Sequence, residues 1–160
     1  MSQEQSQQAG GIREQVTTLD VFNFLSEEDA GTIEKYMFRF EYEAGSFVFR
    51  EGTHGGYMFF IVEGEVEIIK QFDEKSHVIA ELGPGRSVGE MSLIDGAPRS
   101  ASVRAKEDLS LIVLKNEDFR KLLDEHPAIA NKVLMGIATL LSASLRETNK
   151  VFTEKLLSIV

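Results

Sequence analysis

One stretch of the chain, residues 88–101, brings together the groups that could hold an anion. Gly89 has no side chain, so the backbone there can approach a bound molecule closely. Residues 90–94 can form a short helical turn, whose free N–H groups favour an anion. Arg99 follows after a turn, and its guanidinium can grip a phosphate through two parallel charge-assisted hydrogen bonds.

A carboxylate in the same stretch narrows the type of ligand. Glu90 would repel a phosphate unless it accepts hydrogen bonds from another part of the ligand, such as a sugar hydroxyl. Ser100 and the amide of Ala101 can add donors beside Arg99. Alone, Glu90 is more often a carboxylate that favours a helix dipole, and Arg99 a solvated surface side chain. Together at this spacing they indicate a site for the sugar-phosphate of a nucleotide.

The segments around this stretch have the pattern of short strands. Nine of the thirteen glycines lie between Gly45 and Gly96, and glycines at short intervals between apolar runs are typical of turns. Alternation of apolar and polar residues predicts antiparallel strands over one core, as in a sandwich, jelly roll or small barrel. The predicted strands are residues 38–42, 47–49, 58–62, 66–68, 78–82, 101–105 and 109–114.

Helices are expected on both sides of the strands. Ser26 and Asp29 have the spacing of a capping box before a first helix, and Asn116 can cap a second helix over residues 117–125. A third helix is predicted from about 127 to 157, which is long for a globular protein. Its apolar face either packs on the strands of the same chain or forms a seam between two copies.

The composition fits one domain of 160 residues and argues against several kinds of partner. The 26 Asp and Glu outnumber the 17 Lys and Arg, so binding to nucleic acid or to an anionic membrane is not expected. The longest uncharged stretch, residues 133–145, is shorter than the roughly 20 residues of a membrane span. Residues 1–11 lack the apolar segment of a signal peptide, so the sequence predicts a cytoplasmic protein.

Residues for metal or covalent chemistry are sparse. Cysteine is absent, and the three histidines, His54, His77 and His126, are not spaced like the His-x-His ligands of jelly-roll metalloenzymes. The sequence contains neither the Gly-x-Ser-x-Gly nor the Walker pattern. It therefore predicts no metal, no cofactor and no enzymatic activity.

The stretch 88–101 resembles the phosphate-binding cassette of the cyclic-nucleotide-binding domain family. That family includes the bacterial catabolite activator, regulatory subunits of protein kinase A and cyclic-nucleotide-gated channels. Its pattern is Gly-Glu-x-x-Leu, a short spacer, and then Pro-Arg followed by a small residue and alanine. The chain matches this pattern at Gly89, Glu90, Leu93, Pro98, Arg99, Ser100 and Ala101.

Other segments extend the resemblance over nearly the whole chain. Residues 51–52 and 58–66 are similar to the family's second signature, where the β-roll turns, and residues 82–85 precede the cassette as in the family. Residues 116–127 and the long helix after them resemble the family's B and C helices. One departure is Gly56, where many members have an aspartate that helps to relay binding to the helices, and this puts the relay in doubt rather than binding itself.

The resemblance implies a mainly β fold with flanking helices. This fold is an antiparallel β-roll, or double-stranded β-helix jelly roll, with an N-terminal helix and C-terminal B and C helices. It divides the chain into a flexible N-terminal tail (1–20), the β-roll with its flanking helices (21–127), and the long C-terminal helix (128–160). That last helix would act as a lid over the pocket, as a dimer seam, or as both.

The resemblance also implies roles for individual residues. Gly89 and Glu90 would meet the ribose 2′-OH, and Arg99 would pair with the cyclic phosphate. Ile68 and Ile79 would line the pocket for sugar and base, although core packing explains them equally well. The full predicted set is Val88, Gly89, Glu90, Arg99, Ser100, Ala101, Ile68 and Ile79, with Leu141, Ser144 and Leu145 as a base lid.

Two functions remain open from the sequence. The first is a sensor that binds a cyclic mononucleotide and signals through its C-terminal helix to a dimer partner or a protein effector. The second is a structural interaction module with a vestigial pocket, which assembles through the same helix. Ser100 does not decide between adenine and guanine, because family members with a hydroxyl at this position read either base; we favour cAMP over cGMP.

Overall fold

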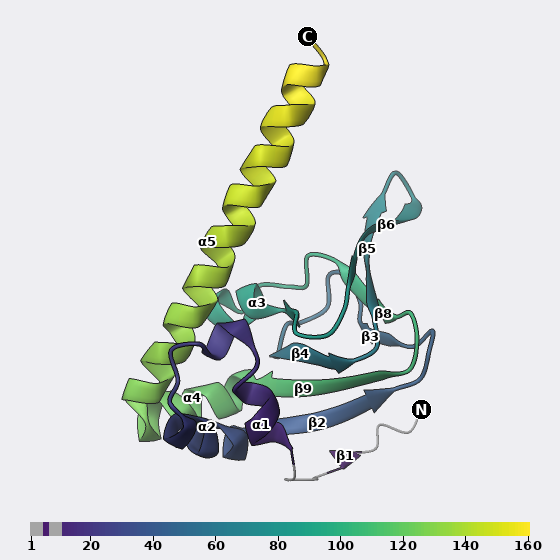
Figure 1. The fold of residues 1–160 in the computed structure, drawn as a ribbon. Helices are drawn as coiled ribbons and strands as arrows, with labels where there is room; N and C mark the ends of the chain where they lie inside the picture. The colour runs from purple at the N-terminus through teal and green to yellow at the C-terminus, as the bar shows by residue number, and fades with distance from the viewer. Residues whose placement is uncertain (1–4, 7–10) are drawn as a thin grey trace.

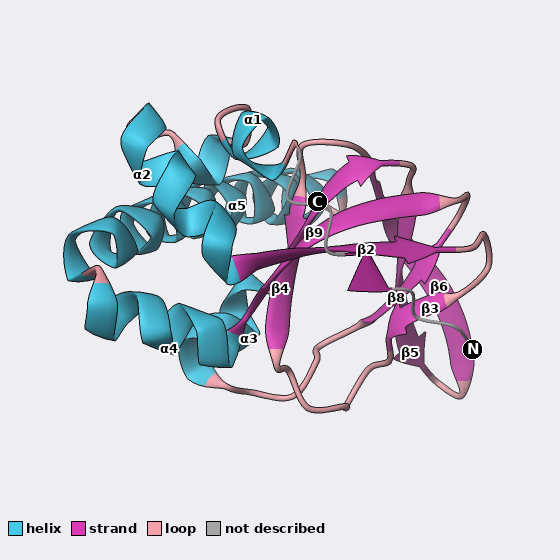
Figure 2. Ribbon diagram, turned by 90° about the horizontal axis from the view of Figure 1, so that it is seen from below, coloured by secondary structure: helices cyan, strands magenta, loops and turns pink. Residues whose placement is uncertain are grey.

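Two antiparallel sheets form a β-roll, and the helices pack against one end of it, as Figure 1 and Figure 2 show. This computed structural model describes residues 5–6 and 11–160. The first sheet has the order β1-β2-β9-β4-β7, and the second has the order β3-β8-β5-β6. The predicted antiparallel β-roll with flanking helices is confirmed. The strands are β1 (Gln5–Ser6), β2 (Met37–Tyr42), β3 (Phe47–Phe49), β4 (Tyr57–Glu63), β5 (Val66–Phe72), β6 (Lys75–Leu82), β7 (Ser87–Val88), β8 (Ser102–Ala105) and β9 (Leu109–Lys115).

The apolar residues of the strands fill two neighbouring cores. β9 lies between β2 and β4 and is buried along nearly all of its length, which explains its unbroken apolar run. One core lies between the two sheets and includes Phe59 and Leu111. The other lies between the first sheet and the helices and includes Phe60 and Ile112. Successive residues of β4 and β9 therefore point into different cores, as the period of two requires.

The helices gather at the end of the roll that carries the second core. The capping box at Ser26 and Asp29 is confirmed, because each side chain accepts a hydrogen bond from the other residue's backbone N–H. The predicted cap at Asn116 is wrong: Asn116 is the first residue of its helix, and its side-chain amide donates to the Gly55 carbonyl. The helices are α1 (Ile12–Val16), η1 (Asp20–Phe22), α2 (Glu27–Ile33), η2 (Glu34–Tyr36), α3 (Glu90–Asp95), α4 (Asn116–Glu125) and α5 (Pro127–Ser158).

Part of the predicted N-terminal tail is folded. Residues 12–16 form α1, and Ile12, Val16 and Leu19 are buried in the core between the first sheet and the helices. Their spacing of four and three residues is that of one face of a helix, which is the signal that favours packing over a tail. Residues 1–4 and 7–10 lie outside the described part of the chain.

α5 has two parts with different surroundings. Its first three turns bury Ile129, Ala130, Val133 and Ile137 in the core, and its remainder rises past the second sheet (Figure 1). By length and composition alone this helix is long and apolar enough to cross a membrane, with a mean hydropathy of 1.5 over an 18-residue window that is 28% buried. The expectation of no membrane span rested on the longest uncharged stretch, residues 133–145, whereas this window admits charged side chains, so the expectation stays a prediction.

A glycine allows α5 to touch the segment before α2. Gly136 lies against η1, where a Cβ atom added to it would be 1.7 Å from the Val21 carbonyl oxygen. No side chain fits in this space, so the two backbones are in direct contact. This contact fixes where α5 leaves the core and thus which of its residues face the second sheet.

Candidate ligand-binding site

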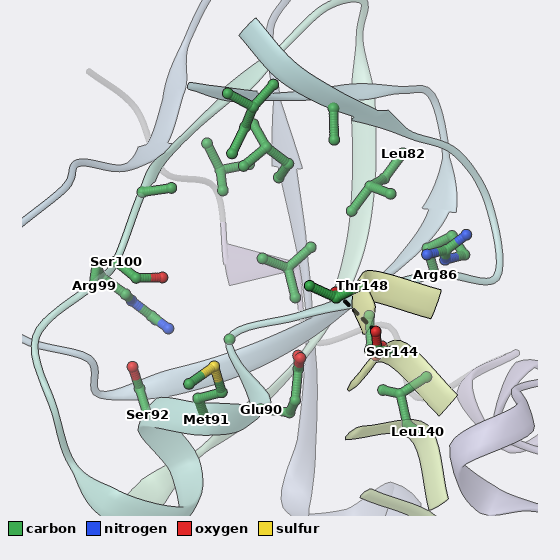
Figure 3. Close-up of a pocket in the computed structure, with 18 of the residues that line it drawn as sticks. Leu82, Arg86, Glu90, Met91, Ser92, Arg99, Ser100, Leu140, Ser144 and Thr148 are labelled. Atoms are coloured by element: carbon green, nitrogen blue, oxygen red, sulfur yellow. Dashed lines mark hydrogen bonds between the residues drawn. The ribbon is translucent and has the colours of Figure 1, made fainter. Parts of the chain in front are cut away.

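A cavity of about 1180 Å³ opens between α3, the second sheet and the outer part of α5. Figure 3 shows Arg99 and Ser100 on one side of this cavity, Ser144 and Thr148 of α5 on the other, and Glu90 between them. The cassette, the sheet and the helix therefore contribute to one site, although they lie far apart in the sequence.

Most of the predicted site residues line this cavity. Those that do are Val88, Gly89, Glu90, Arg99, Ser100, Ala101, Ile68, Ile79 and Ser144. Ile79 is 59% exposed, so the alternative of core packing does not describe it, whereas Ile68 both lines the cavity and packs against the core between the sheets.

Two members of the predicted base lid do not line the cavity. Leu141 packs against the core between the first sheet and the helices, and Leu145 is exposed to solvent. Each follows a cavity-lining residue by one position, which is a rotation of about 100° around a helix. The face of α5 that lines the cavity carries Leu140, Ala143, Ser144, Glu147, Thr148, Val151, Phe152 and Lys155.

Gly89 brings the backbone of the cassette close to Arg99. It has a left-handed conformation, with φ of 90°, and it precedes α3. A Cβ atom at this position would lie 2.5 Å from Nη1 of Arg99 and 3.0 Å from the Tyr57 carbonyl oxygen. Only glycine satisfies both the conformation and the close approach without strain.

Arg99 is the buried cation of the site. Its side chain is only 4% exposed, and burial lowers its pKa below the usual value, although an arginine remains charged at neutral pH. Nη2 donates to the Tyr57 carbonyl over 2.6 Å. Nε and Nη1 are buried, and neither has a hydrogen-bond partner among the described residues. Two donors of one guanidinium are thus left for a bound acceptor.

Glu90 is a buried acceptor in the same cavity. Its Oε2 atom is buried and accepts no hydrogen bond within the described part of the chain. Burial raises the pKa of this carboxyl group, although the positive charges of Arg86 and Arg99 act in the opposite direction. A hydroxyl donor from a ligand would supply the missing hydrogen bond.

The segment after Arg99 is held by a lysine that the sequence did not single out. Nζ of Lys70 donates to the Ser100 carbonyl and forms a 2.6 Å ion pair with Glu51. Glu51 also accepts from the backbone N–H of Gln71, and these contacts lower the pKa of Glu51. Ser100 is thereby tied to β5 before any ligand binds. The signal in the sequence was Glu51 in the second signature, for which no partner could be named.

The arrangement can hold a sugar-phosphate. Two guanidinium donors face a region that also offers a carboxylate acceptor, and an apolar wall formed by Ile68, Ile79 and Leu82 continues toward α5. Among residues 5–6 and 11–160, no three His, Asp or Glu side chains are grouped so that they could hold a metal ion.

Comparison with known proteins identifies relatives of this chain. A family model described as "Cyclic nucleotide-binding domain" matches residues 39–126. The cyclic AMP receptor protein of Thermus thermophilus is 33% identical over 81% of this chain and 58% of its own length. A cyclic nucleotide-gated potassium channel of Mesorhizobium japonicum is 44% identical over 54% of this chain and 23% of its own. The chain thus spans less than two thirds of either relative.

A solved structure has a similar fold over nearly the whole chain. The crystal structure of a cyclic nucleotide-binding domain from Methylobacillus flagellatus superimposes with a TM-score of 0.83 at 32% sequence identity. The match covers 96% of this chain and 88% of that one. It therefore includes α5 and the helices before the roll as well as the sheets.

Proposed function

The chain belongs to the cyclic nucleotide-binding domain family, and from this premise we propose that it is a regulatory protein that binds a cyclic mononucleotide, cAMP in preference to cGMP. One observation carries the proposal: two donor nitrogens of Arg99 and a carboxylate oxygen of Glu90, none of which has a partner within residues 5–6 and 11–160, are buried in one cavity. A sugar-phosphate supplies acceptors for the first and a hydroxyl donor for the second.

Each lining residue then has a role in the proposed complex. Nε and Nη1 of Arg99 bind the cyclic phosphate, together with Ser100 and the amide of Ala101. Glu90 accepts a hydrogen bond from the ribose 2′-OH beside Gly89. The apolar contacts to the sugar and base come from Val88, Ile68 and Ile79. The lid contact comes from Ser144 on α5.

Calorimetric titration of the chain with cAMP and with cGMP tests this function directly. We expect a dissociation constant in the micromolar range or below for cAMP, and weaker binding of cGMP. Absence of binding to both nucleotides would contradict the proposal.

The acidity of Glu90 leads to a prediction about pH. Burial raises the pKa of Glu90, so the carboxylate that accepts from the 2′-OH becomes protonated at a pH above the ordinary value of 4.5. We expect the affinity for cAMP to fall as the pH is lowered toward the raised pKa of Glu90. The cyclic phosphate keeps its charge over this range, so the change reports on Glu90. The Glu90→Gln variant should bind about tenfold more weakly at pH 7.5, because it lacks the charge-assisted hydrogen bond.

Titrations at pH 7.5, 6.5 and 5.5 compare the two proteins. The Glu90→Gln affinity should change less with pH than the wild-type affinity, and equal pH dependence would contradict the assigned acceptor. A raised carboxyl pKa also means that the folded state binds the proton more tightly than the unfolded state, so ionised Glu90 lowers stability at neutral pH. Glu90→Gln is therefore expected to be at least as stable as wild type in thermal unfolding at pH 7.5.

We further propose that α5 transmits the signal. Its cavity-lining face runs from Leu140 to Lys155, so a ligand in the cavity would contact the helix and favour the position in which the helix covers it. Hydrogen exchange in residues 128–157 should become slower when cAMP is added, most of all in residues 140–155. An exchange pattern that is unchanged throughout α5 would contradict this mechanism.

A second candidate function is assembly through α5. Several large apolar side chains on its outer part are more than half exposed, which is typical of a surface that another chain covers. These are Leu145, Phe152 and Leu157. In this alternative the pocket is vestigial, and the titration described above discriminates between the two functions. A homodimer through α5 is compatible with both.

We propose that the protein is a cytoplasmic regulator rather than an enzyme. Its named relatives are a receptor protein and a channel, and the net charge of −9 gives no support for direct contact with nucleic acid. The output is proposed to pass through a dimer contact or a protein effector.

A further inference from the structure

We propose that Phe49 and Tyr57 form an aromatic clamp that positions the guanidinium of Arg99 for the phosphate. Cζ of Arg99 lies 3.9 Å from the centre of the Phe49 ring and 4.7 Å from the centre of the Tyr57 ring. The two rings are inclined by 69° with their centres 6.3 Å apart, so they form two walls of a corner that holds the cation. This inference rests on the proposed function: it assigns the two residues that hold Arg99 in place for the cyclic phosphate.

The clamp is itself held in place. The hydroxyl of Tyr57 donates to the Val48 carbonyl over 3.0 Å, which fixes the plane of its ring. The Phe49 ring packs against the buried ring of Phe59, with the centres 6.0 Å apart. Because neither wall can turn freely, the guanidinium between them is restricted before a ligand arrives, and less conformational entropy is lost on binding.

The chemistry of the clamp leaves the charge of Arg99 available. Within the described residues, no carboxylate lies within ion-pair distance of Arg99, and position 56, next to the clamp, is a glycine. Aromatic faces stabilise a buried cation without accepting its N–H groups. Nε and Nη1 consequently have no partner in the part of the chain that the structure describes, and an incoming phosphate has no carboxylate to displace there.

Neither residue of the clamp is among those that the sequence pattern assigns to the ligand. Phe49 lines the cavity, but Tyr57 acts from behind the guanidinium and contributes both its ring and its carbonyl oxygen. Both are therefore positioning residues, which act on the ligand through Arg99. Their substitution should weaken binding through the phosphate and leave the contacts to the sugar unchanged.

Two variants remove one wall each, Phe49→Leu and Tyr57→Leu. We expect each to weaken cAMP binding by about 5- to 30-fold, in the range of a desolvated cation–π contact. Tyr57→Phe keeps the ring and should bind within about threefold of wild type. Phe47→Leu is the matched control in the same strand: Phe47 packs under Arg50, 3.8 Å from its Cζ, and does not line the main cavity. Its affinity should be unchanged.

A second ligand separates positioning from general loosening of the pocket. The ratio of the cAMP and 2′-deoxy-cAMP affinities reports the sugar contact, so it should keep its wild-type value in the clamp variants. If the ratio fell toward one as the affinity for cAMP fell, the sugar contact would be lost as well, and this would overturn the assigned role. If wild type binds cAMP and both leucine variants bind as tightly as Phe47→Leu, the clamp is wrong and the proposed function stands. If wild type binds no cyclic nucleotide, both fail.

A measurement on the wild-type protein covers the case in which a leucine variant does not fold. In the proton–nitrogen spectrum of arginine side chains, the Nε–H signal of Arg99 is identified by its loss in Arg99→Lys. Ring currents of two stacked aromatic side chains should shift this proton upfield and burial should slow its exchange, already without ligand. A signal at the position of solvated arginines would overturn the clamp.

Discussion

Replacing Arg99 by alanine is expected to weaken the binding of cAMP by at least a hundredfold. The wild-type side chain offers two buried donor nitrogens, Nε and Nη1, that have no partner among the described residues, and each charge-assisted hydrogen bond contributes about 1.5–3 kcal/mol. In the variant the phosphate would enter the cavity with its charge uncompensated, which adds a desolvation cost. Calorimetric titration with cAMP measures the change.

The matched control for this substitution is Arg50→Ala. Arg50 is an exposed arginine near the same end of the roll, and its guanidinium packs over Phe47 on a side that does not line the main cavity. We expect its affinity for cAMP to stay within about threefold of wild type. An Arg99→Ala protein that bound as tightly as Arg50→Ala would contradict the assigned phosphate contact.

The stability of Arg99→Ala should behave differently from its affinity. Arg99 is a buried cation whose Nε and Nη1 have no partner in the described part of the chain, so its removal relieves a desolvation cost while it loses the contacts to Phe49 and Tyr57. We expect the free energy of unfolding without ligand to change by less than about 1 kcal/mol. A large loss of affinity with an unchanged unfolding midpoint identifies a binding residue rather than a structural one.

Replacing Gly136 by alanine should have the largest effect on stability. The added methyl group would lie 1.7 Å from the carbonyl oxygen of Val21 and 2.7 Å from its carbonyl carbon, both backbone atoms of a buried residue. Either α5 or η1 must move away, which disrupts the core around them. We expect a loss of about 3 kcal/mol in the free energy of unfolding, and a midpoint lower by roughly 6–12 °C.

Gly31→Ala provides a control of the same chemistry. Gly31 lies within α2, and its nearest neighbour would be the end of the Arg13 side chain at 3.4 Å, which can shift. Alanine is favoured over glycine inside a helix by about 1 kcal/mol, so this variant should be as stable as wild type or more stable. Equal unfolding midpoints for the two variants would show that the contact between α5 and η1 is not tight in solution.

The cassette could be predicted because its parts are close in sequence. Gly89, Glu90 and Arg99 lie within one short stretch, where chemical type and spacing are visible without the fold. The strands were also readable, since alternation of apolar residues depends only on which face is buried. In the folded chain Gly89, Glu90 and Arg99 all line one cavity, because residues so close in sequence stay close in space.

The neighbours of Arg99 could not be predicted in the same way. Phe49 and Tyr57 come from separate strands, and nothing in their immediate sequence distinguishes them from the other aromatic residues of the roll. Their contact with Arg99 depends on how the two sheets meet.

The rotation of α5 was the other feature hidden from the sequence. Leu141, Ser144 and Leu145 were expected at the base, but the contact of Gly136 with Val21 sets the helix so that Ser144 lines the cavity together with Leu140, whereas Leu141 and Leu145 do not. An error of one position turns a side chain by about 100°, so a helix aligned only by its first residues is placed on the wrong face.

The contact at Gly136 also gives α5 a mechanical property. Twenty-two residues separate Gly136 from Ser158, the last residue of the helix, which corresponds to about 33 Å along its axis. The helix is held in the core at one end of this length and lines the ligand cavity along part of it. The contact with η1 is therefore the point about which α5 would turn. A tilt of about 5° at Gly136 would displace Ser158 by about 3 Å. Under the signalling mechanism proposed above, a change of contact the size of one hydrogen bond inside the cavity would therefore move the end of α5 by a distance that a partner protein could detect.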